Sequence, residues 1–510
     1  MQFNSYIFIL CFLPLTLIGY FGLNRLGKDR LAKLFLLAMS LWFYGYFNVS
    51  YLVIICGSIV VNFAISRLMD SSFAGKEGGT RRLLMIAGVI FNIAVIFYFK
   101  YYDFFIENLN ALFRTDFVLR HVVLPLGISF FTFQQISFIV DAYKGEVKDY
   151  SFLEYALFVT FFPQLVAGPI VLHSELIPQF KDRSKWNMDF DNLSKGIMLF
   201  VRGLSKKVLI ADVFGNAVNW AINQAGAIAV GEGALTVPEI IILMLSYTFQ
   251  IYFDFSGYSD MATGLGLMLN LEIPMNFNSP YKALSVADFW KRWHMTLTRF
   301  LTRYIYIPLG GSRKGKIRTY LNTMIVFLIS GIWHGANWTF ILWGILHGLA
   351  QCFNKITHGI YEAGVLSIGK LPLGKHIMKL VRALQWLVTF AFINVAWLLF
   401  RADSVEMWIS ILKRFSVQYY VVRQEILEPF RIPKLTAALE VLGVANSTVA
   451  ALWISLVIFM IFALVICLCM KNNYQAEYKR NVLSVLSTWV LFILCLISLS
   501  TVSTFLYFNF

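Results

Sequence analysis

Long apolar runs separated by short polar loops make up most of this chain. A helix needs about 20 mainly apolar residues to cross a bilayer. Eleven runs come close to that length: 5–23, 31–47, 49–67, 83–102, 152–171, 235–253, 320–333, 338–354, 382–400, 449–470 and 482–508. Weaker, interrupted runs cover 117–140, 193–213 and 256–271. The pattern predicts an all-α, polytopic membrane protein, a helical bundle with roughly ten to thirteen membrane segments.

Several of these runs are interrupted by helix-breaking or polar residues. Pro125 and Gly127 break the run 117–140, and prolines and glycines break 152–171. A polar group at 254–260, which includes Asp254 and Asp260, interrupts the middle of the stretch 235–271. Broken helices persist in a membrane only where protein or water satisfies the freed backbone groups. The breaks therefore predict a polar cavity or funnel, and the alternative is ordinary loops between short spans.

The composition supports a membrane protein and a single domain. The 510 residues are 58% hydrophobic and 14% charged, whereas soluble proteins are about 25% charged. We expect one transmembrane domain over 1–510, with 401–448 as its longest polar connection and no fused soluble domain. The six cysteines lie in apolar stretches without a CxxC pair, which indicates small hydrophobic side chains rather than disulfides.

The net charge of +15 comes largely from basic residues in short loops. Such loops face the cytoplasm in membrane proteins. The loops 24–33 and 67–82 are both basic, which predicts that they are cytoplasmic and that the N-terminus lies outside the cell. The partners that this charge predicts are anionic lipids or a phosphorylated cosubstrate. Nothing in the sequence resembles a basic, aromatic groove for nucleic acid.

The segment 288–348 contains the candidate chemistry. Over 288–304 we expect an amphipathic interfacial helix with Asp288 as N-cap. One face would carry Arg292, Thr296, Arg299 and Arg303, and the opposite face Trp290, His294, Leu297 and Leu301. The arginines and the basic loop 312–318 suit phosphates. His294 could have a functional role or simply hydrogen-bond a carbonyl in an interface anchor.

His334 lies within the apolar run 320–338, between Trp333 and Gly335. Ionisable groups at membrane depth usually have a function, and a neutral imidazole can take a proton from a hydroxyl. A satisfied packing histidine is the alternative. His347 is expected to line the same cavity, and the remaining histidines to lie at the surface: His121, His173, His358 and His376. No HExxH, Walker loop or GxSxG is present, so we expect no metal site, ATP-driven transport or elbow-type serine hydrolase.

These residues resemble the membrane-bound O-acyltransferase (MBOAT) family, and within it the alginate O-acetylase branch. The resemblance is carried by LPLGISFFTFQQISFIVDAYKG at 124–145, FFPQLVAGPI at 161–170, FDFSGYSDMATGLG at 253–266, NFNSPYKALSVADFWKRWHMTLTRF at 276–300, YIPLGGSRKGKIRTYLN at 306–322, GIWHGANWTFILWGILHG at 331–348 and FRADS at 400–404. It is dense over 120–350. The segment YIPLGGSRKGK favours acetyl over the D-alanyl transfer of a sister branch.

The resemblance implies a helical bundle around a funnel or tunnel and transfer of an acyl group from a thioester to a hydroxyl. His334 corresponds to the family's catalytic histidine, and His294 to a second position near the tunnel. No bound cofactor is implied; acetyl-CoA or an acyl carrier is the expected donor. A separate extracytoplasmic partner of the SGNH hydrolase type is expected to place the acetyl group on an exopolysaccharide or cell-wall polysaccharide.

We therefore expect an O-acetyltransferase in which His334 is a general base or transient acetyl acceptor and His294 and Asn337 orient substrates. Arg292 would attract the donor's phosphates. Tryptophans would wall the site and exclude water: Trp290, Trp293, Trp333 and Trp338. Transfer of D-alanine or another acyl group, a lipid-linked sugar transporter, and a scaffold that only anchors an extracellular acetylase are the alternatives.

Overall fold

The computed structural model describes residues 1–70, 78–147, 149–227, 234–369, 371, 373–416, 420–478, 481–499 and 505–506. Within them the chain forms helices, turns and loops and no strand. Part of the basic loop 67–82 lies outside the described residues, as does part of the predicted run 482–508. The chain divides into two compact units, and the prediction of one domain over 1–510 stays a prediction.

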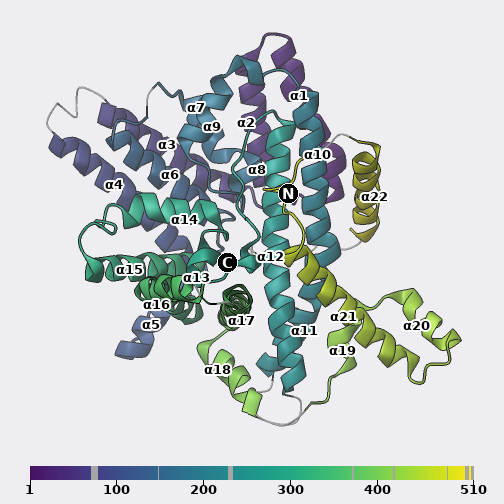
Figure 1. Cartoon of the computed structure of the whole chain (residues 1–510). Coiled ribbons are helices and arrows are strands. Elements are labelled where there is room, and N and C mark those ends of the chain that lie inside the picture. Colours follow the sequence, from purple (N-terminus) through teal and green to yellow (C-terminus); the bar gives the residue numbers. More distant parts are fainter. Residues whose placement is uncertain are drawn as a thin grey trace. The chain divides into compact units, whose positions relative to one another are not determined.

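The first unit comprises Met1–Ser205, Gly257–Met275 and Tyr478–Phe510. Its first helices are mostly long and apolar, and a series of short helices follows the predicted breaks in 152–171. They are η1 Phe8–Phe12, α1 Leu13–Arg25, α2 Asp29–Gly45, α3 Ser50–Asp70, α4 Gly78–Ile96, η3 Phe97–Tyr101, α5 Tyr102–Phe113, α6 Ile128–Tyr143, α7 Phe152–Thr160, α8 Phe162–Leu165, α9 His173–Lys181, η4 Arg183–Lys185, α10 Phe190–Ser205 and α22 Val482–Ser498. Helices α3, α4 and α6 pack side by side (Figure 1).

The second unit comprises Lys206–Ser256 and Asn276–Glu477. Its elements are η5 Lys206–Ala211, α11 Asp212–Ala227, η6 Pro280–Lys282, α13 Val286–Trp290, α14 Met295–Leu301, η7 Thr302–Tyr306, α15 Lys316–His334, α16 Trp338–Gly369, α17 Gly374–Arg401, α18 Val405–Lys413, η8 Arg414–Ser416, α19 Gln424–Leu427, η9 Glu428–Phe430, α20 Pro433–Val441 and α21 Ser447–Leu468. Helix α12, Val237–Met268, contributes to both units. Helices α15 and α16 lie against each other along much of their length (Figure 1).

Six helical segments among the described residues are long and apolar enough to cross a membrane: Phe8–Arg25, Ser50–Asp70, Gly79–Phe113, Val237–Met268, Gly374–Arg401 and Ser447–Leu468. The predicted all-α polytopic class is confirmed. The count of ten to thirteen segments stays a prediction, because α2, α15 and α16 coincide with further predicted runs without meeting the same limits of length and hydropathy.

The predicted breaks at proline and glycine are confirmed. Gly127 has a positive φ of 72° and immediately precedes α6. A Cβ at this position would lie 2.7 Å from the carbonyl oxygen of Leu165, so a close backbone approach as well as the backbone angle requires glycine. The run 152–171 is likewise divided, into α7, α8 and a loop.

The prediction that polar residues at 254–260 separate two segments is wrong, because α12 continues through them as one helix. In the second unit the Asp254 carboxylate receives a hydrogen bond from the ammonium group of Lys207, which is buried, over 2.7 Å. The same ammonium lies 2.9 Å from a carboxylate oxygen of Asp212. A buried carboxylate is tolerated when it is paired, so the helix need not break there. The sequence alone does not reveal this ion cluster.

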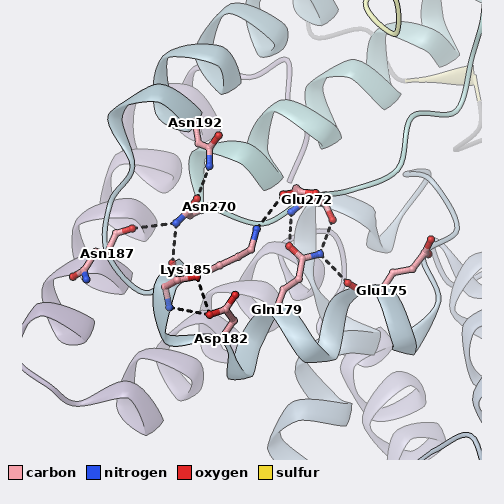
Figure 2. A network of polar contacts seen from close by, with 9 residues as sticks. Glu175, Gln179, Asp182, Lys185, Asn187, Asn192, Asn270 and Glu272 are labelled. Carbon is pink, nitrogen blue, oxygen red and sulfur yellow. Dashed lines mark hydrogen bonds and ion pairs between the residues drawn. The ribbon is translucent and has the colours of Figure 1, made fainter.

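The end of α12 is tied to the α9–η4 segment by a polar network in the first unit (Figure 2). The Gln179 side chain donates to the Glu272 carbonyl at 3.0 Å and accepts from the Glu272 amide at 2.8 Å. The Asn270 amide group donates to the carbonyls of Lys185 and Asn187. These bonds hold the loop that follows α12 against the α9–η4 segment, while the last carbonyls of α12 accept from the backbone amides of Leu269, Asn270 and Leu271.

Candidate active site

His334 is the last residue of α15 and is only 4% exposed. Its imidazole makes edge contacts with the rings of Trp343, at 5.2 Å between centroids, and Phe400, at 5.0 Å. The ring of Trp333 lies 4.9 Å away. The histidine predicted to carry the chemistry is therefore enclosed by three aromatic side chains.

Two glycines let α15 and α16 approach closely beside His334. A Cβ added to Gly331 would overlap the carbonyl oxygen of Phe340, and one added to Gly344 would lie 2.5 Å from the carbonyl oxygen of Phe327. Small residues permit this kind of close helix packing in membranes. The glycines thus bring the aromatic side chains of α16 to the imidazole.

Asn337 holds the connection between the two helices. Its side-chain oxygen accepts from the Thr339 amide at 2.9 Å, as an N-cap does. Its side-chain nitrogen donates to the Asp403 carbonyl at 2.9 Å. Both ends of the amide therefore stabilise the backbone that follows His334, and the predicted contact with donor or acceptor stays a prediction.

The predicted continuous helix over 288–304 is wrong. Helix α13 ends at Trp290, α14 starts at Met295, and His294 between them has a left-handed backbone with φ of 45°. Asn276 stabilises this turn, because its side-chain oxygen accepts from the Thr296 amide and hydroxyl at 3.2 and 2.9 Å. Its carbonyl accepts from the Met295 amide at 3.0 Å. Because Asn276 is distant in the sequence, the periodicity of 288–304 could not predict that the helix is interrupted at His294.

The predicted arrangement of faces is confirmed only in part, because the residues expected on the inner face are buried: Trp290, His294, Leu297 and Leu301. Thr296, placed on the polar face, is buried, and Asp288 does not cap the helix: Ser285 does, by accepting from the Asp288 amide at 3.1 Å. Arg292 is partly exposed and its guanidinium donates to Asp288 at 2.8 Å. Arg292 therefore already has an anionic partner in its own turn, and its predicted binding of a phosphate is not tested.

The hydrogen bonds of His294 define which nitrogen carries the proton. Nδ1 lies 3.2 Å from the side-chain oxygen of Asn276. That oxygen already accepts from the Thr296 amide, so it is an acceptor and Nδ1 must donate. Burial lowers the pKa of His294 to about 3. The imidazole is therefore neutral at ordinary pH, with the lone pair on Nε2.

The two histidines share an aromatic neighbour. The ring of Trp333 lies 6.0 Å from that of His294 and 4.9 Å from that of His334. Of the other predicted wall residues, Trp290 and Trp293 are also buried, and the Trp293 ring lies 4.9 Å from that of Trp397. Trp338 is 56% exposed, so the prediction that it helps to enclose the site is wrong.

His347 joins this aromatic cluster, and the prediction that it lines the same cavity as His334 stays a prediction. It is fully buried on α16, and its Nδ1 accepts from the Trp290 indole at 3.1 Å. Its ring lies 4.5 Å from that of Trp343. The sequence analysis did not select Trp343. Its spacing of four residues before His347 would have placed the two on one helix face.

The remaining polar features divide between surface and interior. The basic side chains of 312–318 are exposed, as predicted: Arg313, Lys314, Lys316 and Arg318. His121, His358 and His376 are exposed as well.

The prediction of a surface position for His173 is wrong. In the first unit it is fully buried and lies 3.1 Å from Asp141 and 3.2 Å from Tyr150. The described residues include no group of three or more His, Cys, Asp or Glu placed to hold a metal ion.

The residues of this site lie in a region of the chain that matches the model of a known protein family. Residues 82–402 match the model of the membrane-bound O-acyltransferase family. A peptidoglycan O-acetyltransferase of Helicobacter pylori is 39% identical, over 100% of this chain and 97% of the relative. A probable alginate O-acetylase of Pseudomonas aeruginosa is 35% identical, over 80% and 73% respectively.

Similarity to D-alanyl transferases is weaker. A teichoic acid D-alanyltransferase of Streptococcus thermophilus is 25% identical, over 56% of this chain and 70% of the relative. The matched family region contains α13 to α16, and hence both His294 and His334.

Proposed function

Because this chain belongs to the membrane-bound O-acyltransferase family and is a multi-pass membrane acyltransferase, we propose that it transfers acetyl groups to hydroxyls of a cell-envelope polysaccharide. Support comes from the two relatives above, whose names specify O-acetyl transfer and which match over most of the chain. The more distant D-alanyl relatives make D-alanine the second candidate for the acyl group. All of these relatives are bacterial, which implies the plasma membrane.

The observation that carries the proposal is the environment of His334. It is buried among aromatic rings at the end of a helix. An aromatic enclosure excludes water, which would otherwise hydrolyse a thioester. In such a site a neutral imidazole can remove the proton of an acceptor hydroxyl, or can accept the acetyl group itself. His294, neutral and with its lone pair on Nε2, is suited to accept a hydrogen bond from donor or acceptor.

For the donor we propose acetyl-CoA or an acetylated carrier reaching the protein from the cytoplasm. The exposed basic segment 312–318, which runs from a loop into the first turn of α15, offers four cations to its phosphates. The proposed orientation has the N-terminus outside the cell, from the basic loops 24–33 and 67–82. The acetyl group would then pass outward to a separate extracytoplasmic SGNH-type partner.

Expression in a bacterium that lacks its own copy tests the proposal. Ester-linked acetate and D-alanine are released from purified envelope polysaccharide by mild base and quantified. We expect acetate with the wild-type chain and none with His334→Ala, while both proteins are inserted in the membrane in equal amounts. Release of D-alanine would move the assignment to the second candidate. Normal acetate with His334→Ala would overturn the role of His334.

The two possible roles of the imidazole differ in a trapping experiment. Purified protein is incubated with acetyl-labelled CoA in the absence of acceptor, quenched and digested. Label on the peptide that contains His334, removable by hydroxylamine, would identify an acetyl-imidazole. Turnover with acceptor but no labelled peptide would assign the general-base role.

A further inference from the structure

The facing sides of α15 and α16 carry two pairs of polar residues, each separated by one helical turn. Ser330 and His334 lie four residues apart on α15, and Trp343 and His347 four residues apart on α16. Residues at this spacing share a helix face. The indole of Trp343 contacts both imidazoles, at 5.2 Å from His334 and 4.5 Å from His347 between ring centroids.

The hydrogen bond from Trp290 determines the tautomer of His347. The Trp290 indole can only donate, and it donates to Nδ1 of His347 over 3.1 Å. Nδ1 therefore bears the lone pair, and in the neutral ring the hydrogen is on Nε2. His347 and His294 thus have opposite tautomers: His347 presents an N–H at Nε2, whereas His294 presents a lone pair there.

Two N–H donors on α16 are buried without an acceptor. Within the part of the chain that the structure describes, no side chain or backbone oxygen accepts from Nε2 of His347 or from Nε1 of Trp343. The hydroxyl of Ser330 likewise has no partner there. All three residues are at most 1% exposed. Leaving a buried donor unsatisfied costs about 1–3 kcal/mol, and such groups in native proteins call for an explanation, often catalytic.

The chemistry of these groups points to an oxygen ligand. An indole N–H and an imidazole Nε2–H are donors only, so together they suit a carbonyl oxygen or an oxyanion. Donors aimed at the oxygen that becomes negative in the transition state are among the largest contributors to acyl transfer. The cluster adjoins His334, the proposed base.

We propose that Trp343 Nε1–H and His347 Nε2–H donate hydrogen bonds to the carbonyl oxygen of the acyl thioester and stabilise it as an oxyanion during transfer. The inference rests on the proposed function. The acceptor hydroxyl oxygen bonds to the carbonyl carbon and its proton passes to His334. The carbonyl π electrons move to the oxygen held by the two donors. When the C=O bond re-forms, the C–S bond breaks and the sulfur takes the proton from His334 as the thiol leaves.

Trp290 is a positioning residue in this arrangement. It does not contact the acyl group but holds the hydrogen of His347 on Nε2. Without the Trp290 N–H, the His347 ring can place its hydrogen on Nδ1 and present a lone pair to the oxyanion. Trp290→Phe keeps an aromatic ring and removes this donor together with the second ring of the indole.

The test uses the purified full chain and acetyl-CoA, or whichever acyl-CoA the wild type consumes, with thiol release as readout. We expect Trp343→Phe to lower kcat about 100-fold with little change in KM, and Trp290→Phe to lower it less. Trp453→Phe is the matched control: this indole is 38% exposed on α21 of the same unit, and kcat should not change. Unchanged kcat in Trp343→Phe would overturn the inference while leaving the proposed function intact.

Two further measurements separate the proposal from a merely structural role. His347→Gln keeps a side-chain N–H and should retain more of kcat than His347→Leu; equal rates would contradict the proposal, and this pair decides the matter if Trp343→Phe does not fold. A CoA thioether bearing a trifluoromethyl ketone forms a tetrahedral adduct that mimics the oxyanion. We expect Trp343→Phe to bind this ketone at least tenfold more weakly while binding CoA as the wild type does; parallel losses for both ligands would indicate misfolding. If the wild-type protein turns over no acyl-CoA at all, the proposed function itself is refuted.

Discussion

Replacing Gly344 by alanine tests whether the close contact of α15 and α16 positions His334. The added Cβ would lie 2.5 Å from the Phe327 carbonyl oxygen, whereas ordinary contact begins at 3.4 Å. The backbone of one helix must therefore move by about 1 Å. Displacements of that size at a catalytic group cost about 100-fold in rate, and overpacking costs about 1–3 kcal/mol of stability.

The measurement combines turnover of purified protein with thermal unfolding in detergent. We expect Gly344→Ala to lose about 100-fold in kcat and to unfold at a temperature several degrees lower. Gly331→Ala, on the facing helix, should act in the same direction. The matched control is Gly57→Ala on α3, where nothing lies within 4 Å of the added Cβ. That change should leave kcat unaltered and gain up to about 1 kcal/mol from helix propensity.

The result that would refute the reasoning is a Gly344→Ala protein with normal turnover and an unchanged unfolding temperature. In that case the two helices do not need their close approach to hold His334. A lower unfolding temperature with an unchanged kcat would support tight packing of the two helices but show that this packing does not position His334 for catalysis.

Three further predictions concern His294, its support and the basic loop. Burial lowers the pKa of His294 to about 3, while an unfolded histidine titrates near 6.5, so the free energy of unfolding falls by about 1.4 kcal/mol per pH unit as the pH drops below 6.5. The unfolding free energy of His294→Gln should therefore depend less on pH between 6.5 and 4 than that of the wild type. The same pH dependence in both proteins would contradict a neutral His294. Asn276→Ala should cost about 1–3 kcal/mol and lower kcat, because the left-handed turn at His294 loses its side-chain acceptor; unfolding and turnover assays check this, and a fully stable, active variant would refute it. Glutamine at the four basic positions of 312–318 should raise KM for acetyl-CoA at low salt and leave kcat unchanged; the difference should shrink as salt is raised, and an unchanged KM would remove the loop from donor binding.

Helix class, membrane character and family were all accessible from the sequence. Apolar runs of spanning length and helix-breaking prolines depend on local chemistry, so the all-α class and the breaks before α6 and within 152–171 were predicted correctly. The motifs that carry the family resemblance are contiguous, so they could be recognised without coordinates, and the family match confirms them.

The errors occur where a distant residue determines the local structure. Polar residues at 254–260 suggested a break, but Lys207 neutralises Asp254 and the helix continues. The periodicity over 288–304 suggested one helix, but the side chain of Asn276 stabilises a left-handed turn at His294. His173 was expected at the surface, but it pairs with Asp141 in the interior.

Hydropathy and contiguous motifs are properties of neighbouring residues, so the membrane acyltransferase class and His334 as the leading catalytic candidate could be inferred without coordinates. The protonation of the site required the folded structure. Which nitrogen of His294 and of His347 carries a hydrogen depends on Asn276 and Trp290, which are 18 and 57 residues away in the chain. Hydrogen bonds between such distant groups exist only after packing has brought them together, so no local pattern could have predicted them.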